Sequence, residues 1–184
     1  ASAGLLSPKI GGASVRTYQP EGVWEAVAMK ESDTRFYQRD SGESLYRRSL
    51  YTFWKRSAPP ASMDIFNAPL RETCTVRRER TNTPLQALVT MNDPQFVEAA
   101  RVLAEQAIVA GGPTLSAQFD FLASRLMGRT LEPKELQIAS AAYSDFLKHY
   151  KSTPADAGKL VSIGERKRQA AVPAAQLAAM TMIA

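Results

Sequence analysis

The chain has 184 residues and a formal net charge of +5, and its content of 45% hydrophobic and 22% charged residues is that of a folded globular protein. One Cys and one His exclude an internal disulfide, a zinc site of the usual Cys/His kind and haem attachment through CxxCH. No apolar run reaches the roughly 20 residues of a membrane-spanning helix, so no membrane span is expected. The length predicts one compact domain.

The first 83 residues are predicted to form an irregular arm with one or two helices. Residues 1–20 are rich in Gly, Ser and Pro, and a short helix is expected over about 21–29. Asp40 and Glu43 have the spacing of a capping box, which predicts a helix in the segment SLYRRSLYTFWKR that follows them. The apolar face of that helix would consist of Tyr46, Leu50, Phe53 and Trp54. A strand is the alternative for this segment, although β-branched residues are scarce in it.

A long connection over residues 57–83 leads to residues 84–184, which are predicted to form a bundle of about five to six helices. Helix starts are expected at Pro residues that follow capping residues, and stops at Gly. The expected helices begin at Pro84, Pro94, Leu115, Pro133, Pro154 and Pro173. The predicted fold class is mainly α, with the irregular Pro/Gly-rich N-terminal third packed on this bundle. Both ends suggest a fragment of a larger protein.

Positive charge is concentrated in residues 46–80, where eight Lys/Arg face three Asp/Glu and give +5. Such a cluster attracts anions: nucleic acid, acidic glycan, acidic lipid or an acidic protein. The alternative is that these arginines pair locally with Asp64, Glu72 and Glu79.

A candidate oxyanion-binding corner lies just before the helix start at Pro84. Arginine forks bind carboxylate, sulfate or phosphate, and a helix N-terminus also favours an anion. The alternative is structural: the arginines would tie the irregular arm to the helices. The candidate residues are Arg77, Arg78, Arg80, Asn82 and Thr83, with Arg47 and Arg48.

Catalytic chemistry finds little support in the residues. His149 is the only imidazole and is expected at a helix C-terminus, where its charge favours the helix dipole. Cys74 is expected to be a buried small side chain, with a reactive thiol as the alternative. An acid–base pair of carboxylates cannot be assigned from the sequence, so catalytic residues stay unknown and the chain is expected not to be an enzyme by itself.

Several motifs together resemble one family. YRRSLYTFWKR, the run APLRETCTVRRERTNTPLQAL, the run NDPQFVEAAR, the GLLSPKIGG opening and the ADAGKLVSIGE stretch are similar to the Planctomycete-specific domain of unknown function, family 1553. The family pattern usually has FDAP where this chain has Phe66-Asn67-Ala68-Pro69, which argues against a functional carboxylate there.

The resemblance implies a secreted or periplasmic protein that is associated with c-type cytochrome modules, and a link to polysaccharide breakdown. It implies no cofactor within this chain, because haem would be held by modules outside it. The leading hypothesis is a non-catalytic accessory or interaction domain whose arginines either hold the domain together or dock an acidic polysaccharide or a cytochrome c-type module. One alternative is part of an enzyme that acts on polysaccharides. A second is nucleic-acid binding, against which a secreted setting argues.

Overall fold

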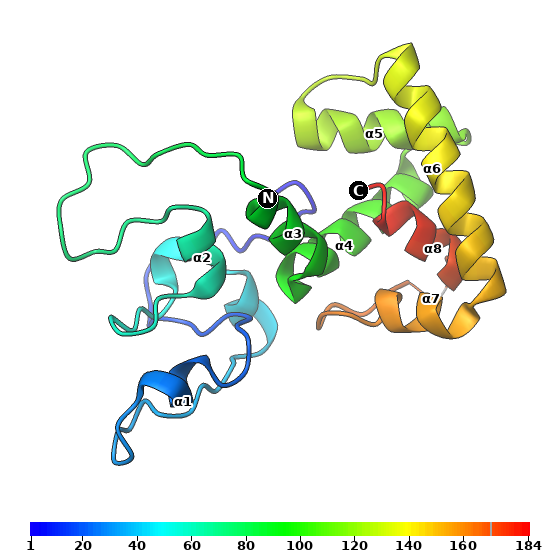
Figure 1. The fold of residues 1–184 in the computed structure, drawn as a ribbon. Helices are drawn as coiled ribbons and strands as arrows, with labels where there is room; N and C mark the ends of the chain where they lie inside the picture. The colour runs from blue at the N-terminus through cyan, green and yellow to red at the C-terminus, as the bar shows by residue number, and fades with distance from the viewer. Residues whose placement is uncertain (170) are drawn as a thin grey trace. The chain divides into compact units, whose positions relative to one another are not determined.

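The computed structural model describes residues 1–169 and 171–184 and confirms a mainly α fold (Figure 1). The described residues form no β-strand, and only two isolated bridges are present, between Val15 and Thr52 and between Lys55 and Ala58. The α-helices and the two 3-10 helices (η) are α1 (Val23–Val27), η1 (Gly42–Tyr46), η2 (Ser49–Tyr51), α2 (Ala61–Ile65), α3 (Pro84–Asn92), α4 (Pro94–Ala110), α5 (Leu115–Met127), α6 (Pro133–Ser152), α7 (Pro154–Val161) and α8 (Ala174–Thr181).

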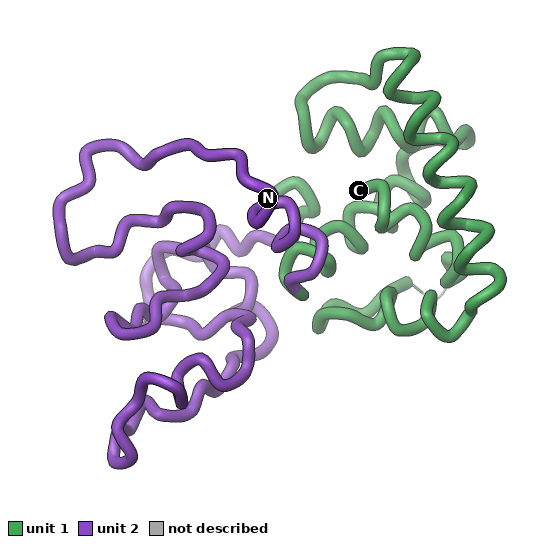
Figure 2. Tube along the Cα trace, in the orientation of Figure 1, with its two compact units in different colours: residues 1–5, 94–184 green, residues 6–93 purple. Residues whose placement is uncertain are grey.

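Figure 2 shows two compact units. Unit 1 consists of residues 1–5 and 94–184, and unit 2 consists of residues 6–93. The sequence-based division after residue 83 lies one helix earlier, because α3 belongs with α2: Gln86 of α3 donates a hydrogen bond to the carbonyl of Ile65 at 2.9 Å. That the whole chain is a single domain stays a prediction.

Unit 1 is a helical bundle built around α8. This helix contacts α4, α6 and α7, and its residues Leu177–Met180 are completely buried. An edge-to-face pair between Phe119 of α5 and Tyr143 of α6, with ring centroids 5.9 Å apart, extends the same core. The first residues of the chain join this unit, since Gln106 donates to the carbonyl of Ala3 at 2.9 Å. Five of the expected helices, α4 to α8, therefore make one core.

The helix boundaries of the second half agree closely with the prediction. Thr83 and Thr114 accept hydrogen bonds from backbone N–H groups of the first turns that they cap, and Pro occupies the first helical turn of α3, α6 and α7. Helix α5 ends at Gly128, whose φ of 73° lies in the left-handed region that glycine tolerates. These local signals position the elements without reference to distant contacts.

The helix predicted from SLYRRSLYTFWKR is wrong. Only η1 and η2 form there, and the chain then becomes extended: Val15 donates to the carbonyl of Tyr51 and accepts from the N–H of Phe53, both at 2.8 Å. Pairing with a distant segment has replaced the i→i−4 bonds of a helix. The expected capping box is wrong as well, because Asp40 accepts from the N–H of Arg16 and Glu43 accepts from the hydroxyl of Ser7.

Unit 2 has a small aromatic core around Trp24. Trp24 is 2% exposed, and the rings of Tyr37 and Phe53 lie 4.8 Å and 5.5 Å from its own. The hydroxyl of Tyr37 donates to the carbonyl of Thr17 at 2.6 Å, while burial, with the nearby charge of Asp40, raises the pKa of Tyr37 to about 12. The core holds the irregular arm together and leaves the segment after α2 outside it.

Candidate anion-binding site

Residues 66–83, here called the arginine loop, connect α2 to α3, and hydrogen bonds join the two ends of the loop, here called its base. Asn67 adopts a left-handed φ of 55°, which Asn tolerates, and its side-chain amide donates to the hydroxyl of Thr81 at 2.6 Å. Gln86 donates to the same hydroxyl at 2.8 Å and to the carbonyl of Ile65. The two ends of a long loop are thereby held together although the loop contains no helix or strand.

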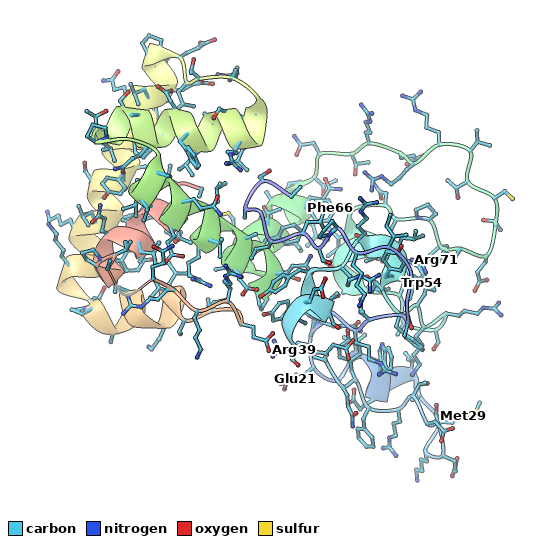
Figure 3. All side chains as sticks on the ribbon, turned by 180° about the vertical axis from the view of Figure 1, so that it is seen from behind. Glu21, Met29, Arg39, Trp54, Phe66 and Arg71 are labelled. Carbon is cyan, nitrogen blue, oxygen red and sulfur yellow. The ribbon has the colours of Figure 1, made fainter. Side chains whose placement is uncertain are left out.

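The first limb of the arginine loop is attached to the segment that precedes α2. The guanidinium of Arg71 lies over the ring of Trp54, 4.8 Å from its centroid, and the two side chains are labelled in Figure 3. One residue further, Arg56 donates to Glu72 at 2.5 Å. That hydrogen bond and the charge of Arg56 lower the pKa of Glu72 and raise the pKa of Arg56. Local pairing, one of the two alternatives for these charges, thus accounts for Arg56 and Glu72.

The second limb of the arginine loop, residues 73–80, is fully accessible and carries Arg77, Arg78 and Arg80. Every residue from 70 to 85 is exposed. Across the described part of the chain, Arg77, Arg78 and Arg80 make no hydrogen bond, ion pair or ring contact, and the amide of Asn82 makes none either. Three cations within four residues therefore keep all their N–H groups available to an external anion.

Thr83 is the N-cap of α3, as the sequence predicted, and this role occupies its hydroxyl and its N–H group. Its hydroxyl accepts from the N–H of Gln86 at 3.3 Å, and the side chain of Gln86 accepts from the N–H of Thr83 at 3.2 Å. This complete capping box satisfies the backbone N–H groups of Thr83 and Gln86, so neither is free to bind an anion. The loop arginines, rather than the start of α3, are the donors that remain.

Arg47 and Arg48 are neighbours, but the first is buried and the second is exposed. Arg47 is 8% exposed, donates to the carbonyl of Gly11 at 2.6 Å, and stacks on Tyr51 at 4.1 Å from the ring centroid. Arg48 is exposed, and among the described residues its side chain makes no hydrogen bond, ion pair or ring contact. Among the described residues, no hydrogen bond or ion pair joins either of them to the second limb, so these interactions do not connect the seven predicted residues into one cluster.

Cys74 corrects a second expectation, because it is exposed rather than buried. It lies in the second limb, where no apolar side chain covers it. The prediction failed because the general tendency of a lone Cys to be buried was applied to a stretch of the loop in which every residue is exposed. His149 lies in the last turn of α6, as expected, where its ring contacts Tyr150.

A buried charged network on α4 was not predicted from the sequence. Glu98, Arg101 and Glu105, here called the latch, are 1%, 0% and 5% exposed. Glu98 accepts from the N–H of Arg166 at 2.6 Å, Glu105 accepts from the N–H of Gln169 at 2.5 Å, and Arg101 donates to the carbonyl of Arg166. Charged residues at i, i+3 and i+7 within an otherwise apolar helix were the signal that could have revealed it.

Other kinds of site find no support in the described residues. No group of three or more His, Cys, Asp or Glu side chains could hold a metal ion there, and no helix among them is both long and apolar enough to cross a bilayer. Glu72 and Glu135 have pKa values that are lowered by hydrogen bonds from arginines in exposed ion pairs. A general acid requires the opposite shift.

The fold and the loop define a helical domain that presents unpaired arginines on an irregular arm. The chain belongs to the PSD1 family, described as "Protein of unknown function (DUF1553)", whose family model matches residues 1–143. The predicted family is therefore confirmed, although the matched range ends before the ADAGKLVSIGE stretch. No curated protein and no solved structure matches the chain.

Proposed function

We propose that this chain is a non-catalytic interaction domain of a larger secreted protein, and that the arginine loop docks an acidic polysaccharide. The observation that carries the proposal is the freedom of Arg77, Arg78 and Arg80 from contacts with other described residues. Arginines that served to hold the arm would be bonded to carbonyls, as Arg47 is. Association with a c-type cytochrome and a periplasmic or extracellular location belong to the same proposal and rest on family resemblance.

The fastened base of the loop supports this proposal energetically. A free loop of this length loses conformational entropy when it binds, and that loss subtracts from affinity. Here the bonds among Asn67, Thr81 and Gln86, with the stacking of Arg71 on Trp54, have already restricted the two ends. Binding then orders mainly the second limb.

The test is binding of fluorescently labelled polygalacturonate to the whole chain across a salt series, with duplex DNA as competitor. We expect saturable binding that weakens as salt rises, because the contacts are between exposed charges. Arg77→Ala/Arg78→Ala should abolish most of it, whereas Lys148→Ala/Lys151→Ala, which removes the same charge from exposed positions of α6, should not. Equal losses in the two variants, with both folded by circular dichroism, would contradict a specific loop.

A protein partner is the second candidate, and α3 is the observation that favours it. This helix carries no charged residue, and Leu85, Leu88 and Met91 on one strip of it are 53%, 57% and 66% exposed. Exposed apolar strips beside charge suit an acidic protein, such as a cytochrome c-type module, better than a glycan. Leu85→Gln/Leu88→Gln separates the two: glycan binding should persist, and binding to a purified acidic c-type cytochrome should fall.

Polysaccharide cleavage and nucleic-acid binding are the weaker candidates. Polysaccharide cleavage needs a pair of carboxyl groups of which one has a raised pKa and acts as the acid. The pKa values of Glu72 and Glu135 are instead both lowered by arginines. For the second, competition by duplex DNA in the same assay is decisive. DNA that displaces polygalacturonate at stoichiometric concentration would favour nucleic acid instead.

A further inference from the structure

The latch fixes the backbone of the loop that follows α7. Its three side chains bind main-chain groups of Arg166 and Gln169, which lie 64 or more residues further along the chain. Backbone N–H and C=O groups of this loop are therefore directed at α4. Since these bonds involve ionised groups that are almost fully buried, they restrain the loop more strongly than exposed bonds would.

The side chains of the same loop lie on its outer side. Arg166, Lys167 and Arg168 are consecutive and exposed, and among the described residues their side chains make no hydrogen bond, ion pair or ring contact. Three neighbouring residues span about 10 Å of extended chain, so the three charges are held within a short distance of one another. A restrained backbone with three free cations is a preorganised arrangement for an anion.

We infer that residues 166–168 form a second anion-binding site, in unit 1, for a compact molecule with several phosphate or sulfate groups. Residues 165–168 and the latch together contain four cations and three anions. The cations are Arg166, Lys167, Arg168 and Arg101, and the anions are Glu165, Glu98 and Glu105. A single anionic group gains little from such a small excess. Several oxyanions on one small molecule contact the cations individually, with arginine forks as bidentate donors.

This site is separate from the arginine loop and does not rest on the proposed function. It consists of residues of unit 1 alone, and residues 70–85 belong to unit 2. The two sites also differ in what restrains them, since the second limb of the arginine loop has no counterpart of the latch. Different variants can therefore remove each site without touching the other.

The experiment is a titration of the ¹⁵N-labelled whole chain, followed by NMR, with sucrose octasulfate in one arm and inorganic triphosphate in the other. We expect saturable shifts of the backbone amides of residues 166–169 in at least one arm, which also distinguishes sulfate from phosphate. Lys167→Gln/Arg168→Gln should weaken binding at least about fivefold, the size that two exposed charge contacts supply. Arg77→Ala/Arg78→Ala should leave the affinity within twofold of wild type.

The contribution of the latch is measured with two substitutions at one position. Glu105→Leu removes the acceptor of the Gln169 N–H, so we expect faster hydrogen exchange at that amide and weaker binding, whereas Glu105→Gln retains an acceptor and should recover both. Unchanged binding in Lys167→Gln/Arg168→Gln overturns the inference, as does the absence of saturable shifts in both arms. Because those two side chains are exposed, that result stands even if Glu105→Leu does not fold.

Discussion

Gly164 lies directly against the side chain of Glu98. Its φ of +90° lies in the left-handed region, and a Cβ at this position would be 2.5 Å from both Cγ and Oε1 of Glu98. Glu98 is 1% exposed and its carboxylate accepts from the N–H of Arg166, so it has no free space into which it could turn. The close approach of loop and helix thus depends on the absence of a side chain at residue 164.

Gly164→Ala is therefore expected to destabilise the chain by about 2 kcal/mol or more, since a left-handed backbone and an overpacked contact each contribute. The measurement is urea unfolding followed by circular dichroism. The loss should appear as a lower midpoint with little change in slope.

Gly158→Ala is the matched control. Gly158 lies inside α7, and a Cβ added there would meet no atom within 4 Å. Replacing an unstrained helical Gly by Ala should stabilise the chain by about 0.5–1 kcal/mol. If the two variants moved the midpoint in the same direction, the contact between Gly164 and Glu98 would not be the tight one that the structure shows.

Arg101→Met is expected to cost about 3 kcal/mol, because it removes the cation of a completely buried network. Glu98, whose carboxylate lies 4.0 Å from the guanidinium, would lose its charged neighbour, and the carbonyl of Arg166 would lose a donor. Arg125→Met, at an exposed position of α5, should stay within about 0.5 kcal/mol of wild type in the same urea assay. A neutral or stabilising Arg101→Met would show that apolar packing replaces the network without loss.

Local sequence signals predicted most of the bundle, and they failed where distant contacts decide. Pro at a helix start and Gly at a helix end act within one turn, so α3 to α7 could be placed from the sequence. The segment around Tyr51 has the apolar spacing of a helix, yet its backbone pairs with Val15, 36 residues away. No local pattern indicates that partner.

In the candidate site, too, features set by local sequence could be predicted and those set by distant contacts could not. The cluster of arginines was visible in the sequence, and the position of the loop followed from Pro and Thr at the start of α3. Which arginine is free could not be predicted, since the partners of Arg47 are the backbone carbonyls of Lys9 and Gly11, and no side-chain pattern indicates that pairing. The latch was not predicted for the same reason: its side chains bind backbone groups of Arg166 and Gln169, which no side-chain pattern indicates.

Arg47 and Arg48 offer a direct test of the difference between a buried, hydrogen-bonded arginine and an exposed one. Arg47→Gln should destabilise the chain by about 2 kcal/mol, because it leaves the carbonyl of Gly11 without its donor and removes the stacking on Tyr51. Arg48→Gln changes an exposed side chain and should stay within about 0.5 kcal/mol. Thermal unfolding of both variants in one buffer is the measurement, and similar losses would mean that the burial of Arg47 carries no stability.

The pair of Arg129 and Glu135 predicts a pH dependence at the start of α6. Arg129 donates to both carboxylate oxygens of Glu135, at 2.7 Å and 2.8 Å, and the N–H of Glu132 donates to one of them at 2.9 Å. These bonds, the one from Arg129 first, lower the pKa of Glu135 from 4.5 to about 2. A lowered folded-state pKa means that the interaction is fully present above about pH 4.5 and is lost as the pH falls towards 2.

The pKa of Glu135 can be measured by ¹³C NMR titration of its side-chain carboxyl group. In Arg129→Gln the pKa should rise towards 4.5, because the largest cause of the shift is removed. Lys134→Gln removes an adjacent exposed cation that makes no contact with Glu135, so there the pKa should stay close to about 2. An equal rise in both variants would assign the shift to the general positive charge of the region. No rise in Arg129→Gln would leave the N–H of Glu132 as its main cause.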